Sequence, residues 1–484
     1  MLDIAKGQTA LFPGAIGADN PILDTDSYKY SHWNQYPEGT GRVSSYIEAR
    51  RASGAIDHVL FFGLQVELAA LGGVFVTQGM LDEAVGFLKA HGFELFARGW
   101  QHIIDAHGGR LPIEIAALPE GTLAPVSVPQ VRIENTDPAC WWLPSFLETR
   151  LLRAVWYPAT VASISHHVVG EIRRRLVITD GSAAGAEFKL HDFGARGAAC
   201  QQAAGLGGAA HLVNSLGTDT VPALAVARNF YGADMAGFSI PASEHSTMTA
   251  LGEEGELAQM ERLLRAYPRG LVACVSDSYD LFRAIEAYWG GALKGIVEAR
   301  DGVLVVRPDS GDPVKIVPAV IEALMERFGF ETTRQGYRRL PPFVRVIQGD
   351  GIDRTSITGI MDAMMDRGLS IGNVAFGMGG GLLQKVDRDT FGYAMKASAL
   401  KRNGVWHDIH KDPKTAGGTK RSKRGRQGAV WSDGTLRAAR LEDIPAGEDA
   451  LRPVFRDGEI LLRQTLDEIR ARAWPGVPGL DPRA

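Results

Sequence analysis

Charged side chains recur in the middle of the chain at the points where short apolar runs end. In LVVRPDSGD, residues 304–312, Arg307 and Asp309 come directly after the apolar run. The same change occurs in FKLHDFGARG from Phe188, NSLGTDT from Asn214, GFSIPASEHS from Gly237, LVACVSDSYD from Leu271, FVRVIQGDGID from Phe343 and VAFGMGGG from Val374. Carboxylates and guanidinium groups brought to one place would bind a cation such as Mg²⁺ and the oxygens of a phosphorylated substrate.

The elements that would position these side chains form a repeating pattern. An amphipathic, helix-like stretch lies between most of the junctions, which predicts βα units around a parallel sheet. Seven such units favour a (β/α) barrel, incomplete or irregular, with its active site at the carboxyl ends of the strands. Ordinary turns also favour Asp, Gly and Ser. A turn explains one such junction easily and seven less well.

The two flanks have a different character. Residues 112–134 read as short strands of an antiparallel or mixed sheet, followed by helices around 141–156 and 159–176. Asp-Gly between β-prone runs predicts hairpins in AVWSDGTLRAAR and PVFRDGEILLR. We therefore expect an α/β protein in which residues 1–180 and 393–484 build one mixed α+β domain and residues 181–392 are a barrel inserted in it.

Composition excludes several classes of protein. The 484 residues are 45% hydrophobic and carry a net charge of −4, which argues against a nucleic-acid binder. The three cysteines stand apart without CxxC spacing, so we expect a reducing compartment, no structural zinc and no disulfide framework. No secretory signal and no apolar run of about 18 residues is evident. These features predict a soluble, cytoplasmic protein without a membrane partner.

Two glycine-rich motifs and one basic run have more than one interpretation. GLGGAA, residues 205–210, follows a helical stretch rather than a strand, so we reject a dinucleotide site. FGMGGG, ending at Gly381, is either a phosphate-binding loop or a flexible turn. The run at 411–428 holds seven basic residues and one acid, and reads as a solvated loop or as a lid over phosphates.

Asp277 and Asp309 each follow an apolar run and are the candidate metal ligands. They would hold Mg²⁺ directly or through water, or grip ribose hydroxyls instead. The residues alone leave these roles open.

An ordered set of motifs resembles one family. NPILDTDSYKYSHWNQYP, FFGLQ, ENTDP, KLHDFGARG, GTDT, PASEHST, SDSYD, RPDSG, RVIQGDG, FGMGGGLLQK and KRSKRGR occur in one order over nearly the whole chain. The set is similar to that of the nicotinamide phosphoribosyltransferases, in the nicotinate/nicotinamide phosphoribosyltransferase superfamily. The resemblance implies transfer of phosphoribosyl from phosphoribosyl pyrophosphate (PRPP) to nicotinamide in NAD salvage, by a homodimer with shared active sites.

The resemblance also implies roles for individual residues. Phe193 and the partner subunit's Tyr28 would sandwich the pyridine ring, and Asp219 would accept a hydrogen bond from the carboxamide, selecting amide over acid. Arg196 and Arg307 match positions near the amide, the phosphates and the pyrophosphate. The remaining matches are to the ribose and phosphate cradle, Gly349, Asp350, Gly379 and Gly380, and to basic residues around phosphates, Arg388, Lys396 and Lys411.

His245 matches a histidine that is phosphorylated by ATP in the family, which would couple ATP hydrolysis to synthesis. A general base is not needed, because the attacking pyridine nitrogen carries no proton. The chain departs from the family at Ala273 and Met378, both in place of serine, which changes the polarity expected near the base pocket.

Three other functions are compatible with parts of the sequence. Nicotinate phosphoribosyltransferase shares the fold and the donor, and Asp219 argues against it. A barrel aldolase would want a lysine at the end of a strand, whereas Lys189 lies early in its strand. A binding or signalling protein on an inactive scaffold would not require the complete charged set.

Overall fold

The computed structural model describes residues 20–411 and 422–483, so most of the basic run at 411–428 lies outside the described residues. The chain forms two compact units. The first contains the residues up to Ser163, Asn229–Ala233 and Val386–Pro475, and the second contains Ile164–Arg228, Asp234–Lys385 and the residues from Gly476 on.

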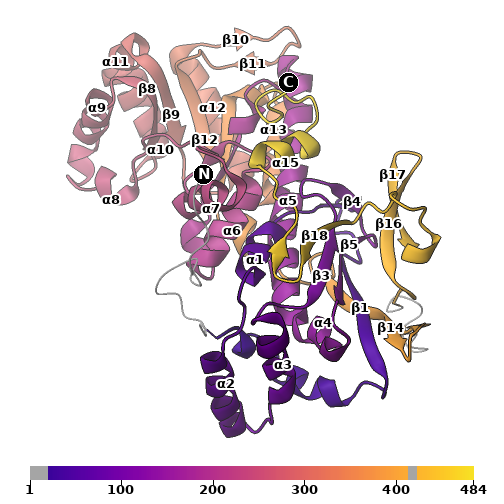
Figure 1. Ribbon diagram of the computed structural model, residues 1–484. Helices are drawn as coiled ribbons and strands as arrows, with labels where there is room; N and C mark the ends of the chain where they lie inside the picture. Colours follow the sequence, from indigo (N-terminus) through magenta and orange to yellow (C-terminus); the bar gives the residue numbers. More distant parts are fainter. Residues whose placement is uncertain (1–19, 412–421, 484) are drawn as a thin grey trace. The chain divides into compact units, whose positions relative to one another are not determined.

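A seven-stranded antiparallel sheet organises the first unit. Its order is β15-β14-β1-β5-β3-β18-β19, and β1 pairs with β14 through partners such as Val43 and Leu400. Segments from both ends of the sequence therefore share one sheet (Figure 1). The strands are β1 (Thr40–Glu48), β3 (Ile113–Ala117), β5 (Pro129–Asn135), β14 (Ala394–Arg402), β15 (Val405–Asp408), β18 (Arg452–Arg456) and β19 (Glu459–Ile460).

Both predicted Asp-Gly hairpins are confirmed. β16 (Gln427–Ser432) pairs with β17 (Thr435–Arg440), and β18 pairs with β19. Asp433, Gly434, Asp457 and Gly458 all have positive φ angles. This is the left-handed backbone that a two-residue hairpin turn requires and that Asp-Gly tolerates. A third pair joins β2 (His58–Leu60) to β4 (Leu123–Pro125).

The prediction of two helices around 141–156 and 159–176 is wrong. After the short α4 (Leu143–Phe146), one helix, α5 (Glu148–Asp180), runs for 33 residues with Pro158 inside it. Proline in a helix interior costs about 3 kcal/mol. The neighbours Val155, Ala159 and Val161 are fully buried, and their burial offsets that cost. The first unit includes α5 up to Ser163, and the second unit includes the rest of it. The other helices of the first unit are α1 (Leu64–Leu71), α2 (Gln78–His91), α3 (Ala97–His107) and α15 (Leu466–Ala473), with single turns η1 (Pro21–Leu23), η3 (Pro138–Cys140) and η10 (Leu441–Asp443) and the longer 3₁₀ segment η2 (Ser27–Asn34).

A six-stranded parallel sheet organises the second unit, with the order β7-β6-β13-β12-β9-β8. These strands are β6 (Leu190–Asp192), β7 (Gly217–Thr218), β8 (Arg269–Val275), β9 (Asp301–Arg307), β12 (Val344–Gln348) and β13 (Val374–Met378). Six of the seven predicted junctions thus follow parallel strands. The α/β class and the parallel sheet are confirmed.

The seventh predicted strand, in GFSIPASEHS, is irregular. Phe238 bridges to Gly217 of β7 and Ala242 bridges to Ala273 of β8, both in parallel. Pro241 has no N–H to continue a ladder, which explains the absence of a regular strand. Ala273, Val305 and Ile347 pack with Ile240 and Phe193 inside the curve of the sheet.

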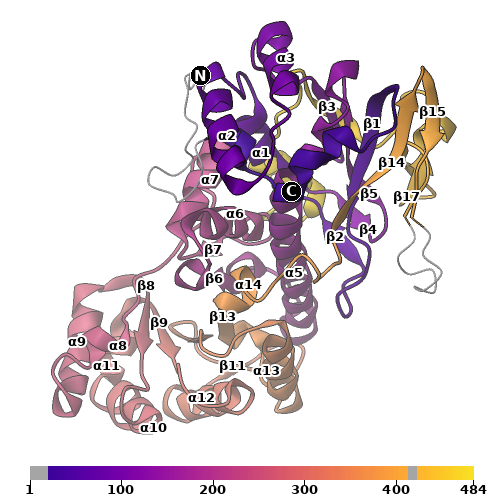
Figure 2. The same ribbon diagram turned by 90° about the horizontal axis from the view of Figure 1, so that it is seen from below.

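Helices of the second unit cover the outside of this sheet (Figure 2). The amphipathic α12 (Pro313–Phe328) buries Val317, Ile321 and Leu324, and begins at an Asp312 cap that accepts a hydrogen bond from the Val314 amide. The other helices are α6 (Gln201–His211), α7 (Val221–Tyr231), α8 (His245–Met248), α9 (Glu256–Ala266), α10 (Leu281–Arg283), a π-helix over Ala284–Ala292, α11 (Lys294–Ala299), α13 (Arg354–Asp366) and α14 (Gly380–Leu383), with 3₁₀ turns η4 (Ala186–Phe188), η5 (Ala195–Gly197), η6 (Glu253–Gly255) and η8 (Ile371–Asn373). β10 (Glu331–Thr332) and β11 (Arg338–Arg339) form a small separate pair.

GLGGAA lies inside α6 and does not follow a strand. This agrees with our rejection of a dinucleotide-binding motif there. None of the helices in the described part of the chain combines the length and hydropathy needed to cross a membrane.

The contact between β8 and β9 gives a stability prediction. A Cβ at Gly302 would lie 2.0 Å from the carbonyl oxygen of Gly270, so Gly302→Ala must separate the strands. We expect a loss of about 1–3 kcal/mol in the free energy of unfolding, measured in urea. In the matched control Gly295→Ala, the new Cβ meets nothing within 4 Å and helix propensity makes the change neutral or stabilising. Equal stability of the two variants would contradict the strand contact.

Candidate active site

The carboxyl ends of the parallel strands gather most of the predicted site residues at one edge of the second unit. Arg307 ends β9, and Phe193, Asp219, Asp277, Gly349 and Gly379 come within two residues after β6, β7, β8, β12 and β13. Parallel strands place these ends on the same side of the sheet, where enzymes of this architecture bind their ligands.

Phe193 directly follows β6 at this edge of the sheet. Its amide donates to the Met378 carbonyl at 3.1 Å, which fixes the residue beside β13. A Cβ at Gly377 would lie 2.0 Å from the Phe193 ring, so the ring occupies the space that a side chain would take. The Arg307 guanidinium carbon lies 5.6 Å from the ring centroid.

Arg307 and Asp309 form a two-pronged ion pair. Arg307 Nε and Nη2 donate to Asp309 Oδ1 and Oδ2, each at 2.9 Å. The side chains are only 17% and 15% exposed, so the charges are partly shielded from water and the two parallel bonds fix the orientation of the guanidinium group. The guanidinium keeps its remaining N–H groups for an incoming anion.

His245 and Asp277 form a second pair at the same edge. His245 begins α8, its side chain is 51% exposed, and its Nε2 lies 3.1 Å from Asp277 Oδ1. Asp277 itself is 4% exposed. A buried carboxylate that holds one ring nitrogen leaves the other nitrogen available to a ligand.

Asp219 is exposed at the end of β7. Its amide donates to the Asp192 carbonyl at 2.9 Å, which sets it level with Phe193 on the neighbouring strand. The Ser239 hydroxyl donates to its Oδ1. α7 begins at Val221, and the carboxylate faces solvent.

Asp192, in contrast, is fully buried. The pKa of its carboxyl is raised to about 6, chiefly by burial and to a lesser extent by the Asp219 charge, while the hydrogen bond from the Gly194 amide opposes the shift. Burial likewise lowers the pKa of the adjacent His191. Burial thus favours the neutral forms of Asp192 and His191 more than exposure would, although a carboxyl with a pKa of about 6 is mostly ionised at pH 7.

The glycine loops leave backbone exposed beside these side chains. Gly379 and Gly380 precede and begin α14, and a Cβ at Gly380 would meet nothing within 4 Å. Gly349 faces Arg307, whose Nη2 would lie 3.2 Å from an added Cβ. Asp350 and Arg196 are exposed on the adjoining loops.

Four of the predicted residues belong to the first unit: Tyr28, Arg388, Lys396 and Lys411. Tyr28 is 56% exposed, and Arg388 and Lys411 are exposed as well. Lys396 is partly buried, and this burial lowers its pKa, although the Glu148 charge opposes the shift. Their placement is described within the first unit alone.

The acidic residues fit Mg²⁺ unequally. Both oxygens of Asp309 accept from Arg307, whereas Asp277 uses one oxygen for His245. Mg²⁺ is usually held by one or two carboxylates plus substrate phosphates and water. The residues therefore fit a magnesium ion that arrives with a phosphorylated substrate, with Asp277 as the more available ligand.

Ser239 and Gly377 were missed by the analysis of the sequence. Ser239 lies in the irregular segment, which lacks the alternation of polar and apolar residues that would show which side chains face the site. Gly377 is the second residue of FGMGGG, and only the structure shows that the Phe193 ring occupies the space where its side chain would lie.

Lys189 precedes β6 rather than following it, and donates to the Gly372 carbonyl at 2.8 Å just before β13. Burial lowers its pKa to about 7. The lysine lies at the amino ends of the strands, away from the charged edge, which disfavours an aldolase.

Two family models match this chain. Residues 188–459 match the nicotinate phosphoribosyltransferase family, and residues 20–115 match the N-terminal domain of nicotinamide phosphoribosyltransferase. A nicotinamide phosphoribosyltransferase of Xanthomonas campestris is 47% identical over 464 residues, covering 94% of this chain and 98% of the relative. One from Acinetobacter baylyi is 33% identical, covering 94% and 97%.

Two solved structures share the fold. Nicotinate-nucleotide pyrophosphorylase from Pyrococcus furiosus has a TM-score of 0.59 and 15% identity, covering 94% of each chain. Human nicotinic acid phosphoribosyltransferase has a TM-score of 0.57 and 19% identity, covering 93% of each chain.

The buried Asp192 gives a pH-dependent prediction. Its raised pKa means that the folded state favours the protonated carboxyl, so this stabilisation is present at pH 4 and lost as the pH rises through 6. Asp192→Asn lacks the titration. The free energy of unfolding of the variant, relative to the wild type, should rise by up to about 3 kcal/mol between pH 4 and pH 7. Asp301→Asn, at an exposed position, serves as the control, and a pH-independent difference for Asp192→Asn would contradict the burial argument.

Proposed function

The chain belongs to the nicotinate phosphoribosyltransferase family, a family of pentosyltransferases, and we propose that it forms nicotinamide mononucleotide and pyrophosphate from nicotinamide and PRPP. The observation that carries the choice of base is the alignment of β6 with β7. The Asp219 amide donates to the Asp192 carbonyl. Asp219, which is exposed, therefore follows β7 at the same level as Phe193 follows the neighbouring β6.

The reaction forms one bond and breaks one bond. The pyridine nitrogen attacks the anomeric carbon of PRPP, and the carbon–oxygen bond to pyrophosphate breaks with its electron pair going to the departing oxygen. The ring becomes a pyridinium cation, which the face of Phe193 favours by about 0.5–2 kcal/mol. No proton leaves the nucleophile, so the protein acts by positioning and by stabilising charge.

The guanidinium groups of Arg307 and Arg196 are proposed to bind the pyrophosphate. Arg307 is held in one orientation by Asp309, and Arg196 is exposed on the loop after β6. The fixed fork of donors in a guanidinium group suits phosphate oxygens. Backbone amides near Gly349, Asp350, Gly379 and Gly380 would hold the ribose and the 5′-phosphate. Mg²⁺, held by the phosphates with Asp277 and Asp309, would neutralise the leaving group.

Asp219 favours the amide over the acid. A carboxamide N–H donates to the carboxylate, whereas nicotinate would bring a second negative charge to it. Nicotinate remains the second candidate because the matching family is named for it. A site built on one polar partner can reject the wrong analogue by as much as ~10⁴-fold.

His245 is the proposed acceptor of a phosphoryl group from ATP. One ring nitrogen attacks the γ-phosphorus, the bond to the bridging oxygen breaks, and ADP leaves. The contact between His245 Nε2 and Asp277 supports the role, since a carboxylate on one nitrogen raises the nucleophilicity of the other.

The proposal extends to a cytoplasmic homodimer, with Tyr28, Arg388 and Lys396 serving the partner subunit's site and Lys411 lying near the phosphates. We also propose that the parallel sheet and its helices form an irregular (β/α) barrel, which residues 181–392 insert into the mixed α+β domain. The pairing of segment 238–242 with both β7 and β8 supports that reading.

The test of the function is product formation from PRPP and Mg²⁺ with nicotinamide or nicotinate, each with and without ATP. We expect mononucleotide from the amide at a much higher kcat/KM than from the acid. Turnover of the acid alone would mean that the family's other substrate is the correct one, and turnover of neither would contradict the proposed activity.

Asp219→Asn tests the selecting group. Removing the charge should lower the ratio of kcat/KM for amide to that for acid by at least about 10-fold, toward the limits that single polar contacts allow. Asp234→Asn, exposed beyond α7, should leave the ratio unchanged. An unaltered ratio in Asp219→Asn would remove this carboxylate from the base pocket.

His245→Ala tests the coupling to ATP. The stimulation by ATP, measured as the ratio of kcat/KM with and without the nucleotide, should fall to 1, because no other nitrogen takes the phosphoryl group. The exposed His58→Ala is the control. Full stimulation in His245→Ala would refute the phosphohistidine.

A further inference from the structure

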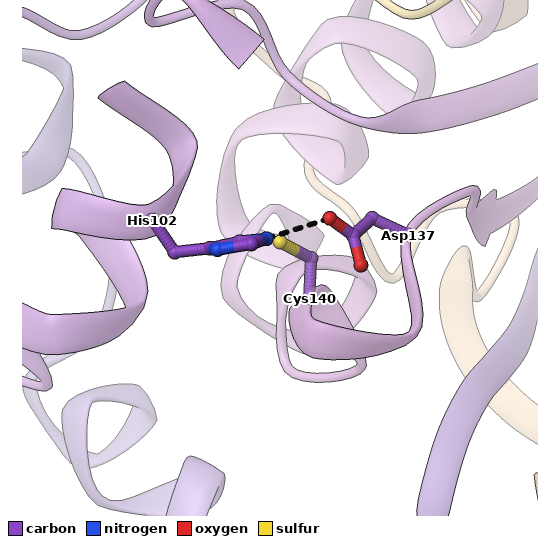
Figure 3. Close-up of side chains that lie close together, drawn as sticks. All are labelled: His102, Asp137 and Cys140. Carbon is purple, nitrogen blue, oxygen red and sulfur yellow. Dashed lines mark hydrogen bonds and ion pairs between the residues drawn. The ribbon is translucent and has the colours of Figure 1, made fainter. Parts of the chain in front are cut away.

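A group of metal-ligating side chains lies in the first unit and has no part in the proposed reaction. His102 on α3, and Asp137 and Cys140 on the turn at η3, bring a nitrogen, a carboxylate oxygen and a sulfur within 4.8 Å of one another. The three side chains converge from these two elements (Figure 3). Among the residues that the structure describes, this is the group of three that meets such a limit.

We propose that His102, Asp137 and Cys140 form a binding site for one Zn²⁺ ion per chain, with His107 orienting the Asp137 carboxylate from outside the coordination sphere. Imidazole, carboxylate and thiolate are the ligands that Zn²⁺ takes in proteins. A hard ion such as Mg²⁺ or Ca²⁺ would not use the sulfur.

The distances fit a small tetrahedral ion after a limited adjustment. Zinc bonds of about 2.0–2.3 Å place neighbouring ligand atoms roughly 3.3–3.8 Å apart. His102 Nε2 now lies 2.7 Å from Asp137 Oδ2, so the ion must part these atoms by about half an ångström. The sulfur lies within 4.8 Å of both other ligand atoms, so a shift of about 1 Å or less brings it to bonding distance of the ion.

His107 supplies the support that metal ligands need. Its Nε2 lies 2.6 Å from Asp137 Oδ2, and the Ala139 amide donates to Oδ1 at 2.8 Å. The carboxylate is thus held from two sides, as ligating carboxylates usually are. His107 contacts Asp137 but is not one of the three residues whose ligand atoms all lie within 4.8 Å of one another. We therefore give it the supporting role and not a place among the ligands.

The burial of the group suits a stabilising ion with an entry path. Cys140 is fully buried, whereas the side chains of His102 and Asp137 are 38% and 20% exposed. The ion would bind to α3 and to the turn after β5 at the same time, joining two segments 35 residues apart. The alternative is a hydrogen-bonded His–Asp–His cluster in which the thiol only fills space.

The experiment uses the full-length protein, stripped with a chelator and then titrated with Zn²⁺ or Co²⁺. We expect one Zn²⁺ per chain by elemental analysis after gel filtration, and a rise in Tm on adding Zn²⁺. Co²⁺ should give the near-ultraviolet charge-transfer band of a cobalt–thiolate bond. These readouts are independent of activity, so their failure is separate from a failure of the proposed transferase function.

Variants distinguish the metal site from the hydrogen-bonded cluster. Cys140→Ser should abolish the charge-transfer band and His102→Ala should abolish stoichiometric binding, whereas His107→Gln should weaken Zn²⁺ affinity by roughly 10- to 100-fold. Cys200→Ser, at the exposed cysteine, is the matched control and should retain the band. Wild-type protein that binds no stoichiometric Zn²⁺, or a band that survives in Cys140→Ser, would overturn the proposal.

Discussion

The parallel hydrogen bonding of β6 with β7 and β13 is the constraint on which the site depends. It sets Asp192 opposite Thr218 and Met378, and so carries Phe193, Asp219 and Gly379 to the same edge. The ring of Phe193 then fits only because Gly377 has no side chain. A shift of register by one residue would turn the Phe193 side chain to the other face of the sheet, and the ring proposed to bind the base would be lost from this edge.

The charges at this edge are arranged so that most are already balanced. Arg307 is paired with Asp309 and Asp277 holds His245, while burial favours the neutral form of Asp192 by raising its pKa to about 6. Asp219 is the exposed carboxylate whose only described side-chain partner is a hydroxyl. The pairs of Arg307 with Asp309 and of His245 with Asp277 avoid unpaired charges at these partly buried positions, where an uncompensated charge would cost several kcal/mol.

Much of this organisation could be predicted from the sequence, because local chemistry determines it. The end of β9 at Arg307 and the turn at Asp433-Gly434 follow from period and turn residues. The continuous α5 could not be predicted. The residues around Pro158 are buried by parts of the chain distant in sequence, and this burial outweighs the local tendency of proline to end a helix. Ser239 could not be predicted either, because its segment is placed by single bridges to β7 and β8 and has no regular strand period. The cluster of His102, Asp137 and Cys140 joins two separate segments, and no cysteine spacing signals it.

The most direct test of the account is a crystal structure with nicotinamide mononucleotide and pyrophosphate bound. The account predicts the pyridine ring against Phe193, with its carboxamide nitrogen within hydrogen-bond distance of Asp219 and pyrophosphate oxygens on Arg307. A mononucleotide bound at the amino ends of the strands, or with its amide turned away from Asp219, would contradict it.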